Sequence, residues 1–99
     1  MPVDEREGEE RTGAMGEMPK VDFATFVLSL GTTALYQMGV IEDPASGKKE
    51  APKPLLAGQT IDTLEMLRDK TLGNLDPEER KLIDSLLHEL RLHFVALDR

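Results

Sequence analysis

The chain has 99 residues, of which 19 are acidic and 12 are basic, so its formal net charge at pH 7 is -7. It contains no cysteine, which excludes disulfide bonds, thiol catalysis and thiolate metal sites. The negative charge disfavours binding to nucleic acids and to anionic membrane surfaces, because both are themselves negatively charged. A chain of this length forms one domain at most, and its small core favours self-association.

Residues 1–21 are rich in acidic residues and glycine and poor in apolar ones. A segment that can bury so little apolar surface is expected to be a disordered acidic tail. We interpret it as a solubilising tail; the alternative is a docking arm that orders on a basic partner. The beginning of the sequence has neither the basic start nor the apolar run of a secretory signal, so we do not expect it to act as one.

A single helical domain is expected over residues 22–99, and its first element is an uncharged segment, Phe23–Ile41. Asp22 can accept the free N–H groups of a first helical turn, and Gly39 can end the helix, which predicts a helix over about 22–39. Its apolar residues form two stripes. Together they present more apolar surface than a hairpin of two neighbouring helices can cover. We therefore predict that this helix forms a homo-oligomer interface through Phe23, Phe26, Val27, Leu30, Gly31, Ala34, Leu35 and Met38.

Small residues gather in the middle of this helix, around Gly31. Glycine within a helix costs about 1 kcal/mol relative to alanine, so its presence needs a compensating contact. We expect another helix backbone, from a second copy of the chain, to approach closely here.

A connector follows over residues 40–54, with three prolines and no apolar residue larger than alanine after Ile41. Asp43–Gly47 has the composition of a turn. Ser46, Gly47 and Lys48 are similar to a fragment of a phosphate-binding loop, but the remaining glycines and a preceding strand are missing, so no nucleotide site is expected.

Two amphipathic helices are predicted next, over about 55–72 and about 77–97, from apolar residues spaced three and four apart. Between them, Gly73 and Asn74 can end one helix, while Asp76, Pro77 and Glu79 form the start of another with a capping box. The short turn predicts an antiparallel hairpin, against which the first helix packs. The expected fold class is therefore all-α with three main helices.

No set of residues predicts a catalytic site. His88 and His93 are five residues apart, so they point to different sides of a helix and cannot hold one ion by themselves. Gln59, Thr60 and Asp62 form a polar cluster that either caps a helix or links two helices. Glu65 is expected to face solvent. We therefore expect no enzyme, no cofactor and no metal.

The uncharged segment is close to the roughly 20 residues that cross a bilayer. Polar residues in its middle and acidic residues at both ends argue against a membrane span, because spans carry flanking lysine and arginine. Burial within a helical assembly is the preferred interpretation.

Three separate blocks, FATFVLSLGTTALYQMG, QTIDTLEMLRDKTLGNL and EERKLIDSLLHELRLHFVAL, occur in this order. With them the chain resembles, over about 21–97, a bacterial family known as domain of unknown function number 1844. The resemblance implies a small helical bacterial protein of the cytoplasm and supplies no activity, cofactor or catalytic residue.

These observations predict a non-enzymatic protein-interaction or regulatory module that acts as a homo-oligomer, with an unknown protein as a further partner. The first alternative is a peripheral subunit of a membrane complex, anchored by the first helix. The second is a small metal- or metabolite-binding protein that uses His88 or His93.

Overall fold

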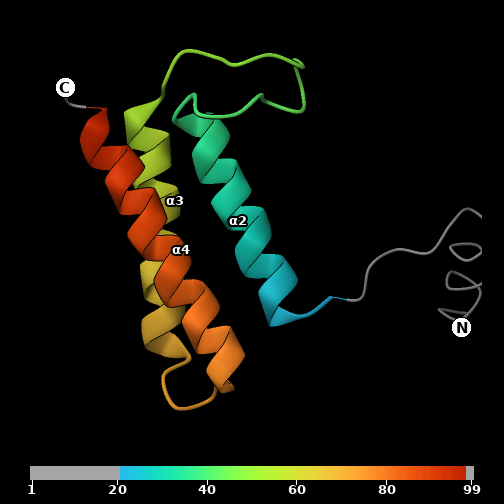
Figure 1. Cartoon of the computed structure of the whole chain (residues 1–99), viewed down its shortest axis with the longest axis vertical. Helices are drawn as coiled ribbons and strands as arrows, with labels where there is room; N and C mark the ends of the chain where they lie inside the picture. Colours follow the sequence, from blue (N-terminus) through green and yellow to red (C-terminus); the bar gives the residue numbers. More distant parts are fainter. Residues whose placement is uncertain (1–20, 98–99) are drawn as a thin grey trace, which may run out of the picture.

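The computed structural model describes residues 21–97, which contain three α-helices and no extended strand. These are α2 (Phe23–Gln37), α3 (Pro54–Lys70) and α4 (Pro77–Ala96). Each helix packs against the other two (Figure 1). The all-α class and the three helices agree with the sequence prediction. The acidic tail predicted for residues 1–21 lies, apart from Val21, outside the described residues.

Both ends of α2 are fixed by local signals. The Asp22 carboxylate accepts a hydrogen bond from the Thr25 backbone N–H at 2.8 Å, as the sequence predicts. At the other end Gly39 has a φ of 77°, and the Val40 N–H donates to the Leu35 carbonyl at 2.9 Å, which is the Schellman arrangement of a helix end. A Cβ atom at position 39 would also lie 2.8 Å from the Glu50 carbonyl oxygen. Both the positive φ and this close approach therefore favour glycine.

The connector between α2 and α3 is a closed loop with a turn at its tip. Asp43 accepts backbone hydrogen bonds from Ser46 and Gly47, and its own N–H donates to the Lys48 carbonyl at 3.0 Å. The Lys53 N–H donates to the Gln37 carbonyl at 2.7 Å, so the loop returns to the residue at which α2 ends. The turn expected at Asp43–Gly47 is confirmed.

A short turn joins α3 to α4 and carries the capping box that the sequence predicts. Gly73 has a φ of 89°, which favours glycine. The Asp76 carboxylate accepts from the Glu79 N–H at 2.8 Å, and the Glu79 carboxylate accepts from the Asp76 N–H at 3.0 Å. Two otherwise unpaired donors at the start of α4 are thereby satisfied.

Asp76→Ala is expected to lower the free energy of unfolding by about 1 kcal/mol, because the carboxylate that accepts from the Glu79 N–H is lost. Urea unfolding followed by circular dichroism measures the change. Ser85→Ala, at an exposed position of the same helix, serves as the control and should leave the midpoint unchanged or slightly raised. Equal effects of the two substitutions would show that the capping box does not stabilise the domain.

The core lies where the inner faces of all three helices meet. It consists of Val27, Ala34, Met38, Ala57, Ile61, Leu64, Ile83, Leu87 and Leu90, each at most 6% exposed. Burial of such side chains contributes about 1.5–3 kcal/mol each, so this cluster is the main source of stability in the domain. The apolar spacing of three and four residues in the sequence explains why each helix presents one such face.

Gly31 of α2 is buried against α4. A Cβ atom at this position would lie 2.8 Å from both methyl carbons of Leu86. The sequence predicted close approach by the backbone of a second copy; the neighbour in the structure is instead a side chain on α4 of the same chain. The glycine therefore makes room for Leu86 within the monomer.

Candidate functional site

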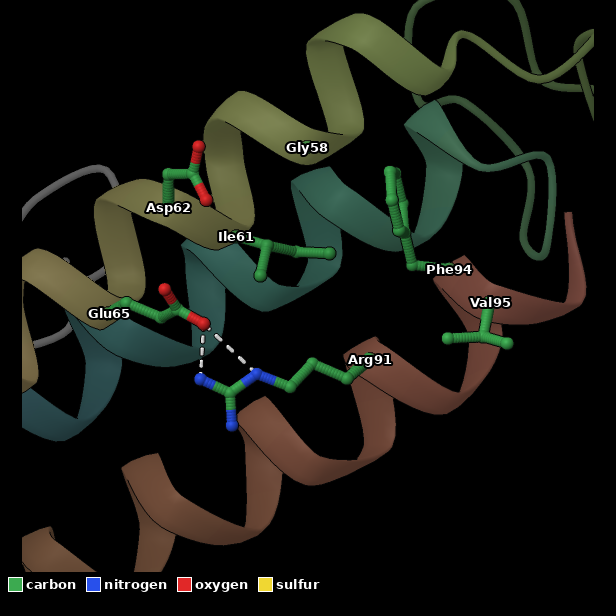
Figure 2. A pocket seen from close by; sticks show the side chains of 7 residues that line it. All are labelled: Gly58, Ile61, Asp62, Glu65, Arg91, Phe94 and Val95. Atoms are coloured by element: carbon green, nitrogen blue, oxygen red, sulfur yellow. Dashed lines mark hydrogen bonds and ion pairs between the residues drawn. The ribbon is translucent and has the colours of Figure 1, made fainter. Parts of the chain in front are cut away.

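A groove of about 310 Å³ lies on the surface between α3 and α4. Four apolar residues line most of it: Gly58 and Ile61 from α3, and Phe94 and Val95 from α4. Asp62, Glu65 and Arg91 complete the lining (Figure 2). The combination of an apolar groove with a few charged groups is typical of binding sites in proteins.

Gly58 lines the groove without a side chain. A Cβ atom there would lie 3.5 Å from the Phe94 ring, an ordinary contact, so sterics do not force glycine at this position. Glycine in the middle of α3 lowers helix stability by about 1 kcal/mol relative to alanine, and its φ is not positive. A lone glycine inside a helical pattern is the one sequence signal at this groove, and it was not among the predicted site residues.

An ion pair crosses the groove between Glu65 of α3 and Arg91 of α4. Both Nε and a terminal nitrogen of the guanidinium donate to the same carboxylate oxygen, Oε2, with the Nε bond at 3.0 Å (Figure 2). The Glu65 and Arg91 side chains are 37% and 43% exposed, so solvent weakens their attraction. Glu65 was expected to face solvent; its side chain is partly exposed, but its carboxylate also links two helices, which the sequence did not predict.

A second group of charges lies further along the same two helices. Arg80 donates to Asp84 at 2.9 Å within α4, and Arg68 of α3 lies 3.8 Å from the other Asp84 oxygen. Asp62 differs from these acidic residues, because no cation of the described range 21–97 pairs with it. An exposed carboxylate without a counterion therefore lies at the edge of the groove.

The structure divides the predicted interface residues of α2 into two groups. Val27, Gly31, Ala34 and Met38 are buried inside the three-helix packing. Phe23, Leu30 and Leu35 are partly buried and pack against the core, and Phe26 is 47% exposed. The predicted set therefore includes residues that one monomer already covers and residues that it leaves partly accessible.

The polar cluster on α3 links helices rather than capping one. Thr60 Oγ1 donates to the Gln37 side-chain oxygen of α2 at 2.7 Å, while Thr63 Oγ1 donates to the Gln59 carbonyl within α3. His88 is exposed and His93 partly buried, both on α4. Across residues 21–97 there is no group of three or more histidine and acidic side chains with the arrangement of a metal site.

The fold and the groove define a small three-helix all-α protein with an apolar surface site. The chain belongs to the family described as domain of unknown function (DUF1844), whose model matches residues 20–96. No curated protein matches the chain, and no solved structure does. In the part of the chain that the structure describes, the helices fall short of the length and apolar character that a membrane crossing needs.

Proposed function

We propose that this chain is a non-enzymatic protein-interaction or regulatory module of the bacterial cytoplasm that acts as a homo-oligomer. The observation that carries the proposal is the amount of apolar side chain that the monomer leaves exposed. On α2 alone, Phe26 is 47% and Leu28 49% exposed. Exposed apolar side chains that lie on one element favour protein contact, and a domain this small gains stability from association.

The framework of this module is an antiparallel hairpin of α3 and α4 with α2 packed across it. In Figure 1 the colours along α3 and α4 run in opposite directions, which supports the hairpin. Helical hairpins are rigid because both helices are anchored at a short turn, here residues 71–76. A rigid scaffold limits the loss of conformational entropy when a partner binds.

The proposed interface between copies uses the accessible part of the predicted set. Phe26, Leu30 and Leu35 keep exposed surface on α2, and Leu28 lies on the same helix between them. Phe26 and Leu30 lie on one flank of α2, and Leu28 and Leu35 lie on the opposite flank. Two such helices that meet about a two-fold axis would therefore bury the apolar side chains of one flank of each copy. The buried residues Val27, Ala34 and Met38 then support the interface from beneath rather than contacting the other copy.

The self-association is tested by light scattering after size-exclusion chromatography at micromolar concentration. The expected mass is a multiple of the monomer mass of 11.0 kDa. The double variant Phe26→Ser/Leu28→Ser is expected to run as a monomer, whereas Leu92→Ser on α4, which is 59% exposed in the wild type, should keep the wild-type mass. A wild-type protein that elutes as a clean monomer would refute the homo-oligomer.

A further inference from the structure

We propose that the groove between α3 and α4 binds a basic amphipathic helix of a partner protein. In this complex an apolar side chain of the partner enters beside Phe94 and Val95, and a neighbouring lysine or arginine pairs with Asp62. The inference rests on the interaction role proposed above and names the partner's chemistry. It concerns a different surface from the α2 interface between copies.

The size and lining of the groove favour an inserted side chain. Its volume of about 310 Å³ is at the lower end for small-molecule sites, which are commonly about 300–1,000 Å³. Gly58 lines the groove from α3 without a side chain, while Phe94 and Val95 supply an apolar surface on α4. Val95 is 51% exposed, so a partner side chain would remove apolar surface from water. Insertion of one face of a helix into such a groove is a common mode of recognition.

The charges at the groove select a cation. Within residues 21–97, Asp62 has no cationic partner, and Glu65 uses only Oε2 for Arg91, which leaves Oε1 without a hydrogen bond (Figure 2). The two residues are three apart, so their carboxylates are neighbours on the helix surface. Among the described residues, Arg91 is the one cation that lines the groove, and it is already paired with Glu65. A lysine or arginine in the partner would therefore meet an uncompensated negative potential, which accelerates and orients binding.

The same charges disfavour the other occupants. Residues 1–20 of this chain carry six acidic and three basic residues, and a second copy carries the same net charge of -7. Either one would bring further negative charge to the Asp62 side of the groove. A basic helix from another protein is the occupant that these observations favour.

The test uses the full chain and three fluorescein-labelled peptides. The first is a helical peptide of leucine and lysine, the second has glutamate in place of every lysine, and the third is residues 1–20 of this chain. Fluorescence anisotropy is expected to show binding of the lysine peptide alone, weakened by salt. Asp62→Lys and Val95→Ser should each weaken it, by roughly tenfold or more for the charge reversal. The matched controls Asp69→Lys on α3 and Leu92→Ser on α4 do not line the groove and should bind as the wild type does. Unchanged thermal midpoints show that the variants are folded.

Four outcomes overturn the inference. In the anisotropy measurement they are equal binding of the lysine peptide by all variants, tighter binding of the glutamate peptide, and tighter binding of the peptide of residues 1–20. The fourth is a change of oligomer mass in Asp62→Lys or Val95→Ser. The last two would assign the groove to the acidic tail or to a second copy. Monomeric protein that binds the lysine peptide through Asp62 would support the groove while refuting self-association, so the two proposals fail separately.

Discussion

Leu90→Ala is expected to lower the free energy of unfolding by about 2–5 kcal/mol, the largest loss we expect from one substitution. Leu90 is 0% exposed and lies in the cluster that the three helices share. Alanine removes three carbon atoms and leaves a cavity that the surrounding helices fill only in part. Since small domains are stable by about 5–15 kcal/mol in total, the variant should be largely unfolded at moderate urea concentration.

Equilibrium unfolding in urea, monitored by circular dichroism at 222 nm, measures this loss. Leu92→Ala is the matched control, because the same chemical change is made two residues further along α4 at a side chain that is 59% exposed. We expect the control to change the free energy by less than about 0.5 kcal/mol. Similar losses at both positions would mean that α4 does not pack through the face assigned to it here.

Gly31→Leu is expected to destabilise the monomer by about 2 kcal/mol. Leucine gains about 1 kcal/mol in helix propensity over glycine. Against this gain, a side chain whose first carbon would already lie 2.8 Å from Leu86 must displace α4, at a cost of about 3 kcal/mol. For a domain of this size the net loss corresponds to a fall of about 8–16 °C in the midpoint of thermal unfolding.

Thermal unfolding of single and double variants tests the origin of this effect. Leu86→Ala, introduced into Gly31→Leu, should restore a large part of the lost midpoint, because it removes the two methyl groups that conflict. Gly31→Ala should stay within about 1 kcal/mol of wild type, since the atoms that its Cβ would meet are the methyl groups at the flexible end of Leu86, which can move away. If Leu86→Ala does not restore the thermal midpoint of Gly31→Leu, the steric conflict lies with another neighbour, for example in a second copy of the chain.

Local features of the fold could be predicted from the sequence because their partners are close in the chain. Asp22 with Thr25 and Asp76 with Glu79 are three residues apart, so the helix starts follow from short-range chemistry. The spacing of apolar residues likewise predicted three helices whose observed bounds lie within two residues of the expected ones.

Features that depend on how the helices lie against each other could not be predicted in this way. Periodicity placed Glu65 on an outer face, and only the position of α4 brings Arg91, twenty-six residues later, to its carboxylate. The prediction at Gly31 was contact with a second copy of the chain, because the sequence does not show that Leu86 faces this glycine. The groove could not be predicted for the same reason, because Gly58 and Phe94 become neighbours only when α3 and α4 pack against each other.

The closed connector makes the protein tolerant of added chain length at one place. Its two ends meet through the Lys53–Gln37 backbone bond, and its tip is held by Asp43 and Lys48, so neither helix depends on residues 44–47. Gly47 has no atom within 4 Å of where a side chain would begin. Since each doubling of a flexible loop costs only about 0.6 kcal/mol, an epitope or a fluorescent label can be inserted there without disturbing the bundle. The connector is thus a ready attachment point for following the protein in cells while α2 and the groove stay free.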